Sequence, residues 1–363
     1  MPRFIDLLDA GVGRTPQVLD TGVDYLKQRP GPTRLIGSNG HYNAGWLESF
    51  DGQLNLRDSD ALDLSFQRWF HLAFDGPQHF IVCNLANLTR ASNCALLVVD
   101  KHTGAFENVS LTHVRPGDTV RHDDALRHFH DDETGSFIRT SADLSRVHIC
   151  MRTQHLTFVA TAHHAMGPPM VQVTRFQRGR GVLQWYRILE LEAGLLAIGD
   201  RVFEIPAGTL GTSDRTVGHM RGIQAWNWVA AVGHAVDLDT GERVRLGLQI
   251  ARDRPGARPV VEARKYVVWL EDSVHKLPTA RFDYELLDED NETGPWRIVS
   301  EGDQALELDF TPRFHRRERR ERMLVNADFN QYYGQLSGRV AVAGRRFELE
   351  PCFAVTEQSL LEL

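Results

Sequence analysis

The segment from Asp214 to Trp228 combines a carboxyl group with side chains that could bind and protonate a small molecule. Within it, residues 219–228 read HMRGIQAWNW. Alternate side chains of a strand point to opposite faces, so Trp226 and Trp228 would share one face and Asn227 the other. Aromatic walls with a few aimed polar groups are what a small-molecule pocket needs. A packed core around a hydrogen-bonded Asn would show the same pattern.

A second candidate segment lies near the C-terminal end, where residues 326–338 read NADFNQYYGQLSG. Phe329, Gln331 and Tyr332 would add ring surface and hydrogen-bonding groups to the same kind of pocket. The alternative is an ordinary strand that enters a hairpin, because glycines follow the aromatic residues.

Histidine is unevenly distributed, since twelve of the sixteen lie between His41 and His164. His128 and His130 would project from one side of a strand beside Asp131 and Asp132, which makes a metal-dependent enzyme one hypothesis. Residues 121–134 are so polar that a solvated loop is the stronger interpretation. We therefore expect no metal site.

The run from Arg313 to Arg322 looks like a nucleic-acid patch, but two glutamates interrupt it. The whole chain carries 41 Lys and Arg against 48 Asp and Glu, a formal charge of −7. This balance excludes a generally basic nucleic-acid binder. A solvated, self-paired loop or strand is the expected structure of the run.

Several signals are missing from the sequence. It contains no GxGxxG, P-loop, GxSxG or HExxH motif, so nothing supports nucleotide or redox-cofactor chemistry, and we expect no cofactor. The four cysteines form no CxxC pair, which favours free thiols in a reducing compartment. No apolar run is long enough to span a bilayer, and residues 1–13 do not form a secretory signal. We expect a cytoplasmic protein without a transmembrane segment; the oligomeric state is left open.

Short β-type segments separated by turns dominate the 363 residues. Four Thr-Gly pairs after polar residues fit hairpins with a positive-φ glycine; they end at Gly104, Gly135, Gly241 and Gly294. Short helices are expected only at 18–28 and 123–130. The pattern predicts an all-β fold of two packed antiparallel barrels with few short helices. We place the domains at 1–178 and 179–363, because glycines and prolines cluster near the division.

The chain resembles an uncharacterised family of two-domain, lipocalin-like (calycin) proteins that is similar to carotenoid hydratases, tocopherol cyclase and Diels–Alderase-like cyclases. The pieces that carry the resemblance are Phe66–Phe70, Asn84–Asn87, Arg221–Gly222, Trp226–Trp228, Arg245–Leu248, His275–Leu277, Trp296–Ile298, Leu308–Arg313 and Phe329–Gly338. The resemblance implies two lipocalin-like barrels. It also implies an acidic residue and aromatics near the domain junction that handle protons, and Asp214 falls in the corresponding segment. The Asp-His-Glu-Trp string of the hydratases is not present.

These observations lead to two main function hypotheses. The first is a cofactor-independent hydratase, isomerase or cyclase for a hydrophobic, isoprenoid- or polyketide-like molecule in an apolar pocket near the domain junction. The second is a non-catalytic carrier of lipid or pigment. In the enzyme, Asp214 donates the proton, because a carboxyl group desolvated beside Trp rings has a raised pKa. The expected catalytic residues are Asp214, His219 and Tyr332, and the expected substrate-binding residues are Arg221, Trp226, Asn227, Trp228, Phe329 and Gln331.

Overall fold

A computed structural model describes most of the chain, in twelve stretches of residues. These are 26–50, 52–56, 65–88, 91–113, 120–122, 127–176, 180–220, 223–253, 265–287, 292–300, 305–322 and 325–362.

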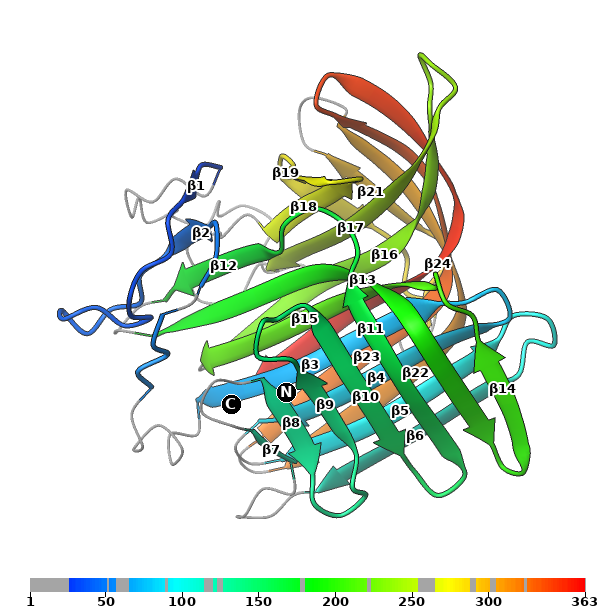
Figure 1. Cartoon of the computed structure of the whole chain (residues 1–363), viewed down its shortest axis with the longest axis horizontal. Coiled ribbons are helices and arrows are strands. Elements are labelled where there is room, and N and C mark those ends of the chain that lie inside the picture. Colours follow the sequence, from blue (N-terminus) through cyan, green and yellow to red (C-terminus); the bar gives the residue numbers. More distant parts are fainter. Residues whose placement is uncertain are drawn as a thin grey trace.

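The described residues form two large curved sheets (Figure 1). The first sheet has fifteen described strands. They are β1 (Gln28–Arg29), β2 (Gly45–Leu47), β3 (Phe66–Asp75), β4 (His79–Asn87), β5 (Ser92–Asp100), β6 (Phe106–His113), β7 (Val120–His122), β8 (His128–Asp131), β9 (Phe137–Thr140), β10 (Arg146–Arg152), β11 (Leu156–His164), β12 (Met170–Arg175), β13 (Gly181–Ile198), β14 (Arg201–Ile205) and β15 (Leu210–His219).

The second sheet has nine described strands. They are β16 (Ile223–Asp237), β17 (Arg243–Asp253), β18 (Lys265–Leu270), β19 (Ser273–Lys276), β20 (Ala280–Asp283), β21 (Trp296–Ser300), β22 (Leu306–Arg322), β23 (Val325–Val342) and β24 (Arg345–Glu362).

Neighbouring strands of both sheets run antiparallel, apart from the short parallel pair β1–β2. The main path of the first sheet is β6-β5-β4-β3-β15-β13-β11-β10-β9-β8-β7, and that of the second is β19-β18-β17-β16-β24-β23-β22-β21-β20. The chain passes from the first sheet to the second between His219 and Ile223, later than the division expected at 178/179. Strands β13, β14 and β15 therefore pair within the first sheet.

The prediction of an all-β fold of two packed antiparallel barrels is confirmed, with each barrel present as a curled antiparallel sheet. Gly104, Gly135 and Gly241 have the positive φ expected in their hairpins, whereas Gly294 is not among the positive-φ glycines. No helix occurs in the described residues, so the expected short helices are wrong over the part of 18–28 and 123–130 that the structure describes. Residues 128–130 belong to β8, because Phe129 is buried in the core, and Gln28 lies in β1. The other residues of the expected helices that the structure does not describe are 18–25 and 123–126.

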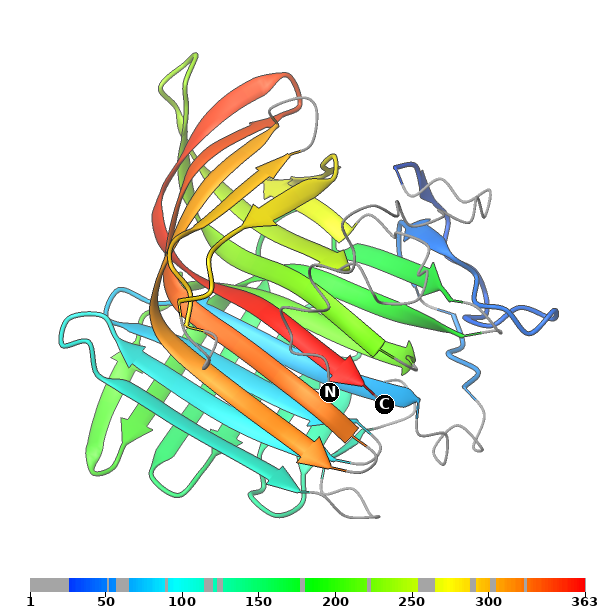
Figure 2. The ribbon, with the colours of Figure 1, turned by 180° about the vertical axis from the view of Figure 1, so that it is seen from behind.

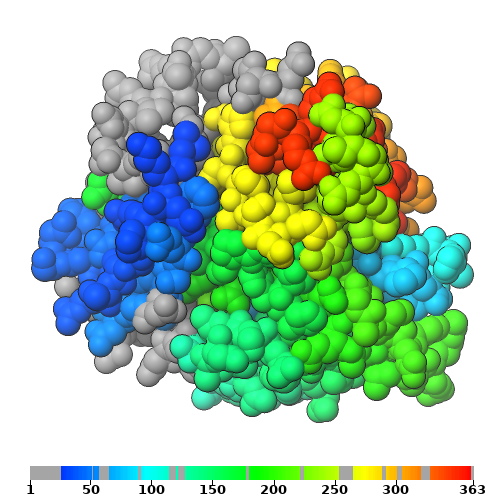
Figure 3. Space-filling view, turned by 45° about the horizontal axis from the view of Figure 1, so that its top comes forward, coloured from blue at the N-terminus to red at the C-terminus, as the bar shows by residue number. Residues whose placement is uncertain are grey.

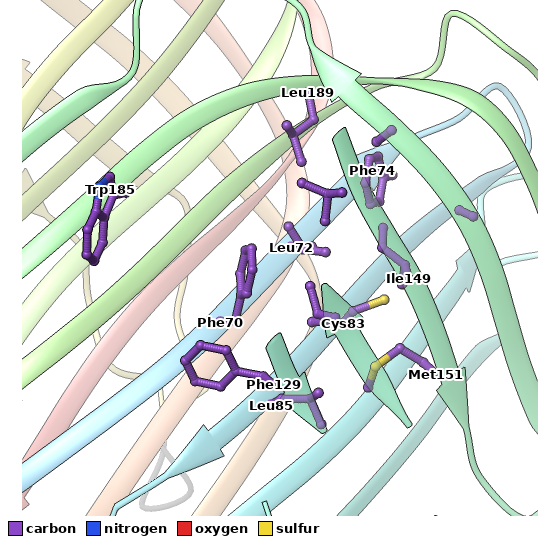
Figure 4. Packing of buried hydrophobic residues seen from close by; sticks show 14 of the residues in the cluster. Phe70, Leu72, Phe74, Cys83, Leu85, Phe129, Ile149, Met151, Trp185 and Leu189 are labelled. Atoms are coloured by element: carbon purple, nitrogen blue, oxygen red, sulfur yellow. The ribbon is translucent and has the colours of Figure 1, made fainter. Parts of the chain in front are cut away.

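Hydrophobic clusters among the described residues explain why the sheets curl and pack. One is enclosed by the first sheet, where Phe70 of β3 meets Phe129 of β8, a strand far from β3 in the sheet, with 5.8 Å between ring centroids, and Trp185 belongs to the same cluster (Figure 4). A second is enclosed by the second sheet around Trp296. A third lies between the sheets, where Ala73 and Val82 of the first pack with Trp228, Tyr333 and Val355 of the second. Strands β3 and β24 contribute residues both to the interior of their own sheet and to the cluster between the sheets, so both of their faces are covered (Figure 2).

Membrane-spanning helices are not found in the part of the chain that the structure describes.

Candidate functional site

The first sheet presents a row of polar and aromatic side chains to the second sheet from β3 and β15. In the antiparallel register Asp214 pairs with His71, and Thr216 pairs with Trp69. The alternate residues Phe70 and Val217 point the other way, into the core of the first sheet. The ring of His71 meets the Trp228 ring of the second sheet edge-on, with 5.3 Å between centroids. This face therefore carries Asp214 into the layer between the sheets.

Asp214 is buried and hydrogen-bonded on both carboxyl oxygens. Trp69 donates its indole N–H to Oδ2 at 3.1 Å, and the Thr216 hydroxyl donates to Oδ1 at 2.8 Å. Burial raises the pKa of Asp214 to about 6, although these two hydrogen bonds and the charge of Lys265 act in the opposite direction. The carboxyl group can therefore hold or release a proton close to neutral pH.

A second buried carboxyl group, Glu357, enters the same layer from β24. Trp226 donates its indole N–H to Oε2 at 2.8 Å, and the Gln331 amide donates to Oε1 at 2.7 Å. Burial raises the pKa of Glu357 to about 7, and the negative charge of Asp214 raises it further, against these hydrogen bonds and the charge of Arg316. The two carboxyl groups are therefore close enough to interact electrostatically.

Arg316 of β22 closes this network on the side of the second sheet. Its Nη1 donates to Oε1 of Gln331 at 2.9 Å, and the Tyr333 hydroxyl donates to the same oxygen at 2.7 Å. Its Nη2 pairs with Glu318 and donates to the Ser110 hydroxyl of β6 at 3.0 Å. The guanidinium thus joins the two sheets, since Ser110 lies in the first.

Three buried polar atoms beside these groups have no partner among the described residues. Both ring nitrogens of His71 are buried and have no hydrogen-bond partner among the described residues. The same is true of the indole N–H of Trp228. Burial lowers the pKa of His71 to about 3, and the charge of Arg316 acts in the same direction, so the imidazole is neutral. Buried polar groups normally find a partner, and a substrate oxygen or a water would supply one here.

The raised pKa of Asp214 predicts a measurable pH dependence of stability. Between about pH 4 and pH 6 the folded chain holds a proton that the unfolded chain has released, so this carboxyl group lowers stability as the pH rises. Relative to wild type, Asp214→Asn should therefore gain about 2–3 kcal/mol of unfolding free energy between pH 4 and pH 7. Urea denaturation at several pH values measures this difference.

The control for that experiment is Asp237, which is also buried but accepts backbone hydrogen bonds from Asp239 and Thr240. Burial opposes ionisation, but these bonds and Arg345 hold its pKa below the usual value. Asp237→Asn should lose stability relative to wild type as the pH rises. The same slope in both variants would contradict the raised pKa of Asp214.

The structure brings together five of the residues expected at the site. Trp226 and Trp228 share the face toward the first sheet, as the alternation predicts, while Asn227 lies on the other face. Asp214 and Gln331 belong to the network described above. Phe329 lies on its margin, with the Arg316 guanidinium 5.9 Å from its ring centroid.

Three other expected residues lie elsewhere. His219 faces the interior of the first sheet, where its Nδ1 is 2.7 Å from the Tyr42 hydroxyl. Tyr332 faces the interior of the second sheet and donates to Gln358 Oε1 at 3.1 Å. Asn227 faces the same interior and donates to the Tyr284 hydroxyl at 3.0 Å.

Arg221 lies outside the described residues, so its place in the site stays a prediction.

Glu357, Arg316, His71 and Trp69 take part in the network but were not selected as site residues from the sequence. Arg316 lies within the run 313–322, which was expected to be solvated, yet its side chain is only 4% exposed. The run is part of β22, and alternate side chains of a strand point to opposite faces. One arginine of a basic run can therefore be buried while its neighbours are exposed.

The histidine-rich segment forms strands rather than the expected loop. β7 and β8 pair with each other, and the His128 and His130 rings lie on one side of β8 with centroids 4.9 Å apart. Among the residues that the structure describes, no group of three His, Cys, Asp or Glu is placed to hold a metal ion.

Comparison with known proteins places this fold. Residues 27–361 match the family described as "Domain of unknown function (DUF2804)". No curated protein matches the chain. A protein assigned as an AttH from Nitrosomonas europaea is 12% identical, with a TM-score of 0.53 over 85% of this chain and 98% of that one. CghA is 11% identical, with a TM-score of 0.50 over 91% and 97%.

A third solved structure, kievitone hydratase from Nectria haematococca, is 12% identical, with a TM-score of 0.48 over 80% of this chain and 88% of that one.

Proposed function

The chain belongs to the DUF2804 family, and we propose that it is a cofactor-independent hydratase, isomerase or cyclase acting on a hydrophobic small molecule at the junction of its two sheets. The observation that carries this proposal is the pair of buried carboxyl groups, Asp214 and Glu357, each with a raised pKa and each held by an indole N–H. Two such groups in one site can act as general acid and general base near neutral pH.

The two carboxyl groups divide the proton transfers. Between about pH 6 and pH 7 the pair holds one proton, mostly on Glu357, and the productive form is the one in which this proton has moved to Asp214. Asp214, the stronger acid of the pair, then donates the proton to a carbon–carbon double bond, and a cation forms on the neighbouring carbon. Glu357, the stronger base, then takes a proton from the water that attacks this cation in a hydration, or from an adjacent carbon in an isomerisation or cyclisation. The proton lost by Asp214 and the proton gained by Glu357 balance, and exchange between the pair restores the starting state.

The surroundings of the pair favour a hydrophobic substrate. The rings of Trp226 and Trp228 lie in the layer between the sheets, and the π face of an indole can stabilise a developing cation. His71 is neutral and adds no positive charge that would repel the cation. Arg316, whose guanidinium contacts the network, is held by Glu318.

A carrier of lipid or pigment is the second candidate function, because the unpartnered buried polar atoms of His71 and Trp228 would equally suit a ligand that is held unchanged. The experiment that separates the two is incubation of the purified protein with polyenes, terpenoids and polyketide-like olefins, followed by mass spectrometry and chromatography. An enzyme releases a product that has gained water or has rearranged. A protein that retains one unchanged ligand through purification, and converts none, would favour the carrier.

A further inference from the structure

Two strand pairs place His71 and Trp228 directly beside the two carboxyl groups. His71 of β3 pairs with Asp214 of β15, and Trp228 of β16 pairs with Glu357 of β24. Directly opposite residues of paired strands point to the same face, with Cβ atoms about 5 Å apart. The His71 and Trp228 rings meet across the layer between the sheets. The four side chains therefore form one group, to which each sheet contributes two members.

The unpartnered atoms of this group have a definite pattern of donors and acceptors. His71 is neutral, because burial and the charge of Arg316 lower its pKa to about 3. A neutral imidazole donates from one ring nitrogen and accepts at the other, whereas an indole N–H only donates. His71 and Trp228 are each only 5% exposed, so bulk water does not satisfy them. A molecule that pairs with all three atoms must both accept and donate hydrogen bonds.

A hydroxyl group combines these two properties in a single oxygen. Its O–H can donate to the acceptor nitrogen of His71, and its lone pairs can accept from the Trp228 indole. The two ring centroids are 5.3 Å apart, and two hydrogen bonds of about 2.9 Å each span such a separation. An ether or carbonyl oxygen only accepts, so it would leave the acceptor nitrogen of His71 without a partner. A hydrocarbon would leave all three atoms unpaired.

Further unpartnered groups lie along the same two strands. The amide nitrogen of Gln67 is on the same face of β3 as His71, and the hydroxyl of Ser359 is on the same face of β24 as Glu357. Both atoms are buried without a partner among the described residues. Strands β3 and β24 contact each other, and on the side shown in Figure 3 the second sheet (yellow) also lies directly against the first (green). Polar groups that lack partners therefore gather where the sheets meet.

We propose that the substrate is an unsaturated alcohol, whose hydroxyl group lies between His71 and Trp228 while its double bond lies beside the carboxyl pair. This inference rests on the proposed function and names the class of substrate for that site. His71 is the neighbour of Asp214 and Trp228 is the neighbour of Glu357, so the hydroxyl is held close to both proton-transferring groups. His71 and Trp228 are then specificity-determining residues.

Calorimetry on the full chain with three saturated probes tests the proposal. The probes are tetrahydrogeraniol, its methyl ether and the hydrocarbon that lacks its hydroxyl group. They have no double bond to protonate, so binding is measured without turnover. The wild type should bind the alcohol at least about 10-fold more tightly than the hydrocarbon, because a site built to pair with a hydroxyl group rejects a molecule that lacks it. The ether accepts but does not donate, and it should bind with an intermediate affinity.

A pair of matched variants assigns the preference to His71. His71→Phe keeps a flat ring against Trp228 but removes both nitrogens, so it should bind the alcohol and the ether equally. His79→Phe is the control, because His79 is another buried histidine of the first sheet whose Nε2 has no partner among the described residues, and its ring packs on Phe203. This control should keep the preference of the wild type.

The imidazole nitrogen NMR signals of His71 give a direct reading of the contact. They are identified by their loss in His71→Phe, and in the wild type they should move when the alcohol is added but not when the hydrocarbon is added. The comparison of the three probes uses the wild type alone, so it does not depend on a variant that folds.

Three results would overturn the inference: equal binding of alcohol and hydrocarbon by the wild type, binding of neither, or an alcohol preference that survives in His71→Phe. These outcomes are distinct from failure of the proposed function, because saturated probes report binding alone. Slow turnover by Asp214→Asn without an alcohol preference would support the carboxyl pair and refute the hydroxyl site. An alcohol preference in a wild type that converts no olefin would do the reverse.

Discussion

The Asp214→Asn variant should turn over the substrate found in the olefin panel about 10²–10⁴-fold more slowly than wild type. This is the usual range for a positioned general acid or base. Asn keeps the shape of the side chain and an oxygen that can accept from Trp69 or Thr216, but it carries no exchangeable acid proton. The loss should therefore appear in kcat more than in KM.

The pH profile of the wild type gives a second measurement of the same pair. Catalysis requires one of the two carboxyl groups to be protonated and the other to be ionised. We therefore expect kcat to be highest between about pH 6 and pH 7 and to fall on both sides. Glu357→Gln should remove one limb of the profile as well as most of the activity. Asp131→Asn replaces another buried aspartate, at the edge of the first sheet, and should leave turnover unchanged. Wild-type turnover by Asp214→Asn would refute the assigned role.

The Arg316→Ala variant should lose about 3–5 kcal/mol of unfolding free energy, which is the usual cost of removing one partner of a buried ion pair. The change would remove the ion pair between Arg316 and Glu318 and one of the two donors to Gln331 Oε1. It would also break the contact with Ser110, which links β22 to the first sheet. Urea denaturation at constant pH measures the loss.

Two further variants show whether burial is the cause. Arg339 of β23 pairs with Glu348, but its side chain is 68% exposed, so Arg339→Ala should cost less than about 1 kcal/mol. Arg316→Lys should not restore stability, because a lysine cannot reach Gln331, Ser110 and Glu318 with one planar fork. A loss in Arg316→Ala as small as that in Arg339→Ala would contradict the buried network.

The sequence predicts the fold better than it predicts the site, and particular residues show why. Alternating residues and Thr-Gly turns are local signals, so the strands around Gly104 and Gly241 follow from them. The same alternation correctly separates Trp226 and Trp228 from Asn227. Which sheet face meets which partner depends on contacts between strands distant in the chain, and no local pattern contains that information.

Glu357 illustrates the part that could not be predicted. It sits in an ordinary alternating strand, and only the docking of β24 against β3 makes it a buried carboxyl group near Asp214. Arg316 is similar, because a run of basic residues reads as solvated until one of them is seen to turn inward. His219 and Tyr332 have suitable chemistry but lie on the opposite faces of their strands.

Each sheet is built from one continuous stretch of chain, whereas the carboxyl pair takes one member from each. The proposed chemistry therefore depends on the interface between the two sheets, because neither sheet contains both carboxyl groups. A substitution that loosens the contact between the sheets would separate Asp214 from Glu357 while leaving every strand hydrogen-bonded. Such a protein would keep the β-sheet signal of a folded chain and yet be inactive. Activity could therefore be lost by separation of the two sheets, before either sheet unfolds.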